Sequence, residues 1–94
     1  MARVVWQPFA LDDLNDIAAY IKQFDPAASV RYRLALRALG DSLWEFPNRG
    51  RPAAGDTREL TSVPSYVLAY RYRELDDTVE VRSIRHGRQQ SPRR

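Results

Sequence analysis

The sequence contains no cysteine, a single histidine and no long apolar segment. Without cysteine the chain can form neither disulfides nor thiolate metal sites, and this composition fits a reducing compartment. No apolar run approaches the roughly 20 residues of a membrane span, and the first residues lack the apolar core of a signal peptide. The chain has one histidine and, apart from acidic pairs such as Asp76-Asp77, no close acidic cluster, so a metal site has almost no support. We therefore expect a cytoplasmic protein without a membrane partner, metal or cofactor.

Lysine is also nearly absent, and arginine supplies almost all of the positive charge. Only Lys22 among the 15 basic residues is lysine, and the formal net charge is +3. From Arg49 onward there are ten arginines and six acidic residues, whereas residues 7–46 carry six acids against four basic residues. Arginine binds carboxylates and phosphates through planar, paired hydrogen bonds. The basic C-terminal half therefore favours an anionic partner, either a nucleic acid or an acidic protein segment.

Two amphipathic helices are predicted in the first half of the chain. Apolar residues recur at three- and four-residue steps over residues 11–24 and again over residues 28–46. Asp25 and Pro26 form a helix-start signal between them, so the second helix is expected from Pro26 to about Phe46. With so short a connection, the two helices should form an antiparallel hairpin.

The remaining apolar segments are β-prone, and they fall at residues 3–7, 57–61, 66–73 and from residue 79 onward. The third segment alternates strictly: Tyr66, Leu68, Tyr70 and Tyr72 share one face, and Val67, Ala69, Arg71 and Arg73 share the other. We expect the face with Leu68 to be core, although tyrosines can also stack on bases. In the last segment Ile84 is out of phase with Val79 and Val81, which indicates either burial on both faces or a bulge near Ser83.

The order of the expected elements is β-α-α-β-β-β. A helical hairpin and a small, mostly antiparallel sheet each have one face to bury, so the sequence predicts an α+β two-layer sandwich. One domain of residues 1–94 is expected from the length. Residues 89–94 are polar and are expected to form a flexible tail.

Several segments, in this order and spacing, resemble the RelE/ParE toxins of bacterial type II toxin–antitoxin modules. The matching segments are Asp13-Leu14…Ile17-Ala18…Tyr20-Ile21, Asp25-Pro26-Ala-Ala28, Phe46-Pro47…Gly50-Arg51, Arg58-Glu59-Leu60, Tyr66-Val-Leu-Ala-Tyr-Arg71 and Ile84-Arg-His-Gly-Arg88. The resemblance covers about residues 3 to 88. It implies a cognate antitoxin as partner, and with it a hetero-oligomer.

The two branches of this family differ in activity, and the resemblance is closer to the ParE branch. RelE-like members cut messenger RNA on the ribosome, whereas the characterised ParE-like members are mostly associated with poisoning DNA gyrase. RelE-like chains typically carry arginine where this chain has Val67, and a second cation where it has Gln89. A late catalytic tyrosine also has no counterpart after Gln89. The resemblance therefore implies that this chain lacks the catalytic residues with which RelE-like members cut RNA.

RNA cleavage remains open as an alternative, because several side chains could serve it. His86 is the only side chain whose ordinary pKa lies near neutral, so it could act as an acid or a base. Arginines could stabilise the charged phosphate, and Glu59 is the nearest acid that strand pairing could bring to His86. The candidate catalytic residues of this alternative are Arg51, Arg58, Arg85 and His86.

The leading hypothesis is a ParE-like toxin that does no chemistry of its own. It would inhibit DNA gyrase by binding, and an acidic, amphipathic segment of the antitoxin would neutralise it. A third alternative is an inactive remnant that only binds antitoxin. The residues expected to contact a partner are Arg58, Arg71, Arg73, Arg85, His86 and Arg88.

Overall fold

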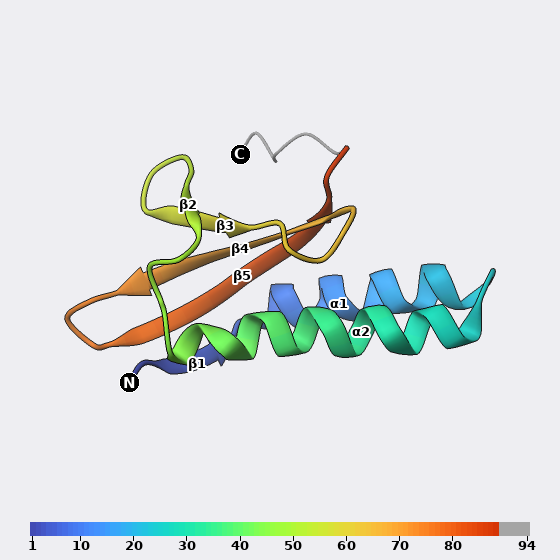
Figure 1. Cartoon of the computed structure of the whole chain (residues 1–94), viewed down its shortest axis with the longest axis horizontal. Helices are drawn as coiled ribbons and strands as arrows, with labels where there is room; N and C mark the ends of the chain where they lie inside the picture. The colour runs from blue at the N-terminus through green and yellow to red at the C-terminus, as the bar shows by residue number, and fades with distance from the viewer. Residues whose placement is uncertain (89–94) are drawn as a thin grey trace.

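The fold consists of a helical hairpin laid on one face of a five-stranded sheet (Figure 1). The computed structural model describes residues 1–88. In chain order its elements are β1 (Arg3–Trp6), α1 (Pro8–Lys22), α2 (Pro26–Asp41), the 3₁₀ helix η1 (Ser42–Trp44), β2 (Arg51–Pro52), β3 (Thr57–Leu60), β4 (Tyr66–Arg73) and β5 (Thr78–His86). The predicted α+β sandwich is confirmed. The expected tail at residues 89–94 lies outside the described residues.

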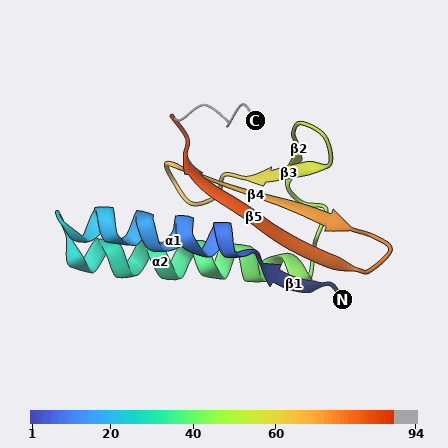
Figure 2. The ribbon, with the colours of Figure 1, turned by 180° about the vertical axis from the view of Figure 1, so that it is seen from behind.

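The strands lie in the order β1-β5-β4-β3-β2, and only the β1–β5 pair is parallel. Figure 2 shows β1 beside the end of β5 that leaves the β4–β5 turn. The strand β2 was not predicted, because it has two residues within a loop rich in proline and glycine. It forms an edge of the sheet, where a proline costs no ladder hydrogen bond.

Both helices begin where the sequence provides a start signal. Pro8 and Pro26 occupy first-turn positions, and the Asp25 side chain accepts a hydrogen bond from the Ala28 amide at 3.0 Å. Neither helix within residues 1–88 is long and apolar enough to cross a membrane.

The predicted end of the second helix was wrong. The helix α2 ends at Asp41 and tightens into η1, so Phe46 lies outside it with 60% of its surface exposed. Ser42 Oγ donates to the Leu39 carbonyl at 2.6 Å, and such local bonds compete with regular helix. The Trp44 carbonyl then accepts from the Ala2 amide at 3.0 Å, which ties the start of the chain to η1.

The core lies between the helical hairpin and the sheet. The face of β4 with Tyr66, Leu68, Tyr70 and Tyr72 packs into or against this core, as predicted. The largest fully buried side chains are Leu14, Leu36, Leu43, Leu68, Tyr70, Val79 and Val81. The tyrosines of β4 therefore serve packing, and an aromatic platform for bases on this face is not formed.

A bulge in β5 explains the irregular spacing of its apolar residues. Ala69 pairs with Ser83 and Tyr70 pairs with Val81, so Arg82 is an extra residue. The insertion returns both Val81 and Ile84 to the core face, where both are buried. Of the two explanations left open by the sequence, the bulge near Ser83 is the one observed.

The hydroxyl of Tyr70 holds the loop after η1 against the sheet. It accepts from the Gly50 amide at 2.9 Å and donates to the Pro47 carbonyl at 2.7 Å. A Cβ at Gly50 would lie 2.7 Å from the Tyr70 ring and hydroxyl, so only glycine permits this approach.

We predict that Tyr70→Phe lowers the free energy of unfolding by about 1–3 kcal/mol, because a buried amide and a carbonyl lose their partner. Tyr20→Phe is the control, since Tyr20 is 62% exposed, and it should change stability by less than about 0.5 kcal/mol. Urea unfolding of both variants measures the difference. Equal stability of the two variants would contradict the role of the Tyr70 hydroxyl.

Candidate functional site

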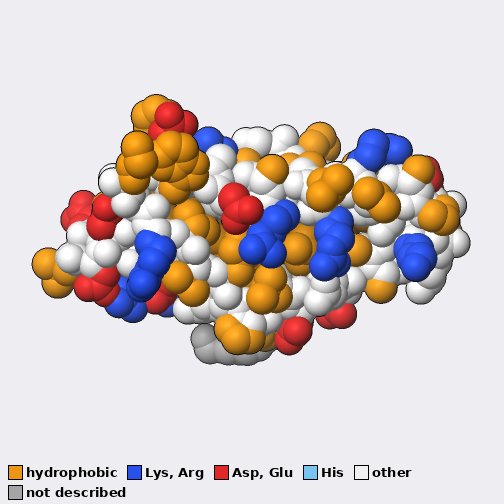
Figure 3. All heavy atoms as spheres, turned by 90° about the horizontal axis from the view of Figure 1, so that it is seen from below, with side chains coloured by type: hydrophobic (Ala, Val, Ile, Leu, Met, Phe, Trp, Pro, Cys, Tyr) orange, Lys and Arg blue, Asp and Glu red, His pale blue; other side chains and the backbone are white. Residues whose placement is uncertain are grey.

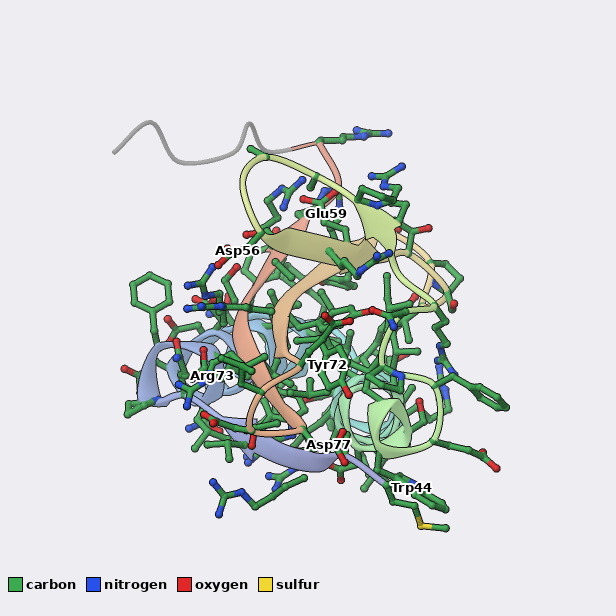
Figure 4. All side chains as sticks on the ribbon, turned by 90° about the vertical axis from the view of Figure 1, so that its left-hand side faces the viewer. Trp44, Asp56, Glu59, Tyr72, Arg73 and Asp77 are labelled. Atoms are coloured by element: carbon green, nitrogen blue, oxygen red, sulfur yellow. The ribbon has the colours of Figure 1, made fainter. Side chains whose placement is uncertain are left out.

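The sheet face that points away from the helices carries a ladder of arginine–carboxylate pairs. Figure 4 shows Asp56 and Glu59 at β3, on the part of the sheet farthest from the helices. The pairs are Arg51–Glu59 (3.1 Å), Arg85–Glu59 (3.0 Å), Arg71–Asp56 (2.8 Å), Arg82–Asp56 (3.2 Å), Arg73–Glu80 (2.8 Å) and Arg73–Asp76. We call this surface the outer face.

The charge of the outer face is largely neutralised within the chain. Among residues 1–88, five arginines meet four carboxylates there, which leaves one formal positive charge. The arginine-rich strands predicted a strongly cationic face, but the acidic residues between the arginines reduce its positive charge. An anionic partner would have to exchange with these internal carboxylates, so it gains less than it would on an uncompensated surface.

Among these pairs, the one between Arg85 and Glu59 is the least exposed to solvent. The Glu59 side chain is 11% exposed and contacts both Arg51 and Arg85, and the Arg85 side chain is 20% exposed. The Arg85 Nε is buried without a hydrogen-bond partner among the described residues. Glu59 therefore provides the main compensation for a charge that is mostly removed from water.

The four candidate catalytic residues are not brought together. Register places Arg51 opposite Glu59 and Arg85 opposite Val67, on the outer face. Arg58 lies opposite Tyr70 and His86 lies opposite Tyr66, so both lie on the helix-facing side.

Arg58 is also engaged by the backbone and distant from His86. It donates to the Asn48 and Gly50 carbonyls at 3.1 Å and 2.7 Å. The β4 partners of Arg58 and His86, Tyr70 and Tyr66, are four residues apart, which is roughly 13 Å along a strand. The ribonuclease alternative therefore has no compact site built from its four residues.

The six expected partner contacts divide in the same way. Arg71, Arg73 and Arg85 lie on the outer face, whereas Arg58 and His86 lie on the helix-facing side. The remaining residue, Arg88, follows β5, and its amide donates to His86 Nδ1 at 3.2 Å. These residues therefore belong to at least two separate surfaces.

The site that sequence reasoning missed is a groove between α1 and the C-terminal half of β5. It has a volume of about 490 Å³ and is bordered by Asp13, Asp16 and Tyr20 of α1 and by Tyr66 and His86 of the sheet. The rings of Tyr66 and His86 meet edge to face at 5.5 Å. We call it the α1–β5 groove.

At this groove the side chain of Asp13 forms a hydrogen bond with the backbone at the edge of β5. The strand β1 pairs with β5 only as far as Val81, and beyond it Asp13 Oδ2 accepts from the Ile84 amide at 2.9 Å. Burial raises the pKa of Asp13, and the nearby charges of Asp16 and Asp12 raise it further, against the lowering effect of the Ile84 hydrogen bond. The contact spans 71 residues of sequence, so no local signal could have indicated it.

Residues 1–88 contain no group of side chains that could bind a metal ion. No group of three or more histidine or acidic side chains in that range is placed to bind an ion. The acids of the outer face are instead paired with arginines.

The fold and its elements define the class to which the chain belongs. The structure of a chromosomal ParDE toxin–antitoxin system from P. aeruginosa superposes with a TM-score of 0.81 over 92% of this chain and 96% of that one. The two chains are 19% identical, so this likeness concerns the fold. The chain thus has the fold of a chain in that system.

Sequence comparison then gives the family. Residues 4–91 match the family described as the ParE toxin of the type II toxin–antitoxin system parDE. The chain is 49% identical to Toxin RelE2 of Caulobacter vibrioides over 87 residues, which is 93% of this chain and 97% of that toxin. It is 37% identical to the putative toxin Y4kP of Sinorhizobium fredii, over 96% and 93% of the two chains. The chain belongs to the ParE/RelE family of type II toxins.

We predict that Glu59→Gln lowers the free energy of unfolding by about 1–3 kcal/mol, because it leaves the Arg85 guanidinium without its compensating charge. Asp56→Asn is the matched control. It removes a carboxylate that is 55% exposed and also contacts two arginines, and it should cost less than about 1 kcal/mol. Thermal or urea unfolding measures both changes. A larger loss in Asp56→Asn would show that Glu59 has no special role.

We predict that the carboxyl of Asp13 titrates above its ordinary pKa of 3.8 in the folded protein. The folded state then binds the proton more tightly than the unfolded state, so this group's contribution to stability falls as pH rises between the two pKa values. Asparagine does not titrate, so Asp13→Asn does not lose stability in this way. The free energy of unfolding of Asp13→Asn, relative to that of the unmodified chain, should therefore rise as pH increases between the two pKa values. Carbon NMR of the carboxyl and unfolding at several pH values test this; a pKa below 3.8 would contradict it.

Proposed function

We propose that this toxin acts by binding, that its target is DNA gyrase and that a cognate antitoxin neutralises it. The supporting observation is the division of Arg51, Arg58, Arg85 and His86 between the two faces of the sheet. Metal-free RNA cleavage needs a base, an acid and a stabiliser of the phosphate charge around one reacting bond. Residues divided between two faces do not surround one bond, which favours binding over this chemistry.

The gyrase assignment itself rests on the family. Residues 4–91 match the ParE toxin description, and the resemblance of the sequence is to the ParE branch, whose characterised members are mostly associated with gyrase. Gyrase acts on DNA in the cytoplasm, which would be the site of action.

Two surfaces support a wrapping antitoxin segment. The outer face presents arginines that can exchange their internal carboxylates for those of an acidic segment. The helical hairpin exposes apolar side chains between basic ones, as Figure 3 shows. These include Phe24, Val30 and Leu34, each more than half exposed. A segment that orders on binding can cover both surfaces.

We predict that the purified chain inhibits supercoiling by gyrase and traps cleaved DNA, and that adding the antitoxin encoded by the neighbouring gene restores activity. The reason is that binding alone accounts for the effect, so supercoiling should be inhibited without any cleavage of transcripts by the chain. An agarose-gel assay of plasmid topology measures this. Unchanged supercoiling without trapped breaks, at a concentration of chain in excess over gyrase, would refute the gyrase target.

The alternative function is ribosome-dependent cleavage of messenger RNA, and the names of two relatives favour it. Toxin RelE2 and Toxin RelE1 of Caulobacter vibrioides are 49% and 41% identical to this chain. The alternative requires transcripts to be cut in a translating extract and the cutting to be lost in His86→Ala, with Tyr20→Phe as the control. Intact transcripts would exclude it.

The remaining alternative is an inactive remnant that only binds antitoxin. It differs from both toxin hypotheses in one respect, because expression without antitoxin would leave growth unchanged. Growth arrest on expression would exclude it, whichever target is responsible.

A further inference from the structure

The α1–β5 groove is negatively polarised in a chain whose formal net charge is +3. Asp13 and Asp16 face it from α1. Arg85 borders it as well, but the Arg85 guanidinium is directed to Glu59 at 3.0 Å on the outer face. The groove is therefore a local acidic site, opposite in sign to the protein as a whole.

The two carboxylates of the groove repel each other. The pKa of Asp13 is raised first by its burial and then by the charge of Asp16, with Asp12 on the same helix adding to it. The Asp13 Oδ2 accepts from the Ile84 amide at 2.9 Å, and this hydrogen bond favours the position of the carboxylate beside β5. A cation placed between Asp13 and Asp16 would relieve this repulsion.

The opposite wall of the groove is aromatic. Tyr66 packs edge to face on His86 at 5.5 Å and on Tyr32 of α2 at 5.7 Å, which fixes its ring. Tyr20 stands at the rim with 62% of its surface exposed. A planar guanidinium can stack on such rings while its N–H groups pair with carboxylates, whereas the compact ammonium of lysine can pair but stacks less well.

We propose that the α1–β5 groove binds an arginine side chain carried by a segment of another protein. The carboxylates of Asp13 and Asp16 would pair with the positive charge of the guanidinium, and the rings of Tyr20 and Tyr66 would stack on its plane. The volume of about 490 Å³ accommodates one long side chain together with its own backbone. The inference does not depend on whether the toxin's target is gyrase or the ribosome.

The test uses the full chain labelled with ¹⁵N and the capped tripeptide acetyl-Gly-Arg-Gly-amide at low ionic strength. Saturable shifts are expected at the amides of Ile84 and His86 and at those of the α1 turn around Asp16. The same tripeptide with citrulline in place of arginine keeps the length and planar shape of the side chain but has no charge and carries a carbonyl oxygen in place of one donor nitrogen. It should bind at least about tenfold more weakly. The lysine tripeptide should fall between the two.

A pair of variants separates the groove from general attraction to an acidic surface. Asp16→Asn removes an exposed carboxylate of the groove and should weaken binding of the arginine tripeptide at least about fivefold, with the fold retained. Glu45→Gln removes one negative charge beyond the far end of α2 and should leave binding unchanged.

Four results would overturn the proposal. The first is equal binding of the arginine and citrulline tripeptides, and the second is equal binding of the arginine and lysine tripeptides. The third is the same loss of affinity in Glu45→Gln as in Asp16→Asn. The fourth is no shift at Ile84 at the highest soluble concentration of the arginine tripeptide.

Discussion

The strand β5 and its bulge at Arg82 determine how the rest of the chain is arranged. It pairs with β1 on one side and β4 on the other, and it packs beneath α1. The extra residue lets Val81 and Ile84 share the core face although three positions separate them. Without it, the residues after the bulge would exchange faces, and Ile84 would point away from the core.

The same register decides the distribution of functional side chains. Because successive residues of a strand point to opposite faces, Arg85 joins the outer face and His86 the helix-facing side. On the outer face Glu59 compensates Arg85, and the arginines of this layer become part of a charge network. On the other side His86 and Tyr66 complete the wall of the α1–β5 groove. One strand thus supplies two surfaces of opposite character.

Local sequence signals predicted the elements well. The Asp25-Pro26 start, the alternation of residues 66–73 and the phase change at Ile84 each have a cause within a few residues, and each was confirmed. The end of α2 was missed, because Ser42 bonds back to the Leu39 carbonyl and Trp44 is tied to the start of the chain.

Long-range pairing could not be predicted in the same way. Composition indicated a cationic sheet, but strand register placed Asp56 and Glu59 among its arginines. The contact of Asp13 with Ile84 likewise joins residues that only the folded chain brings together. The grouping of these side chains in space therefore could not be predicted from the sequence.

We propose that this toxin acts by binding and leaves RNA intact. The decisive experiment maps transcript 5′ ends in growth-arrested cells that express the chain and measures plasmid supercoiling in the same cells. We expect relaxed plasmid and no new transcript ends within coding sequences. New ends within translated codons, with supercoiling unchanged, would contradict it.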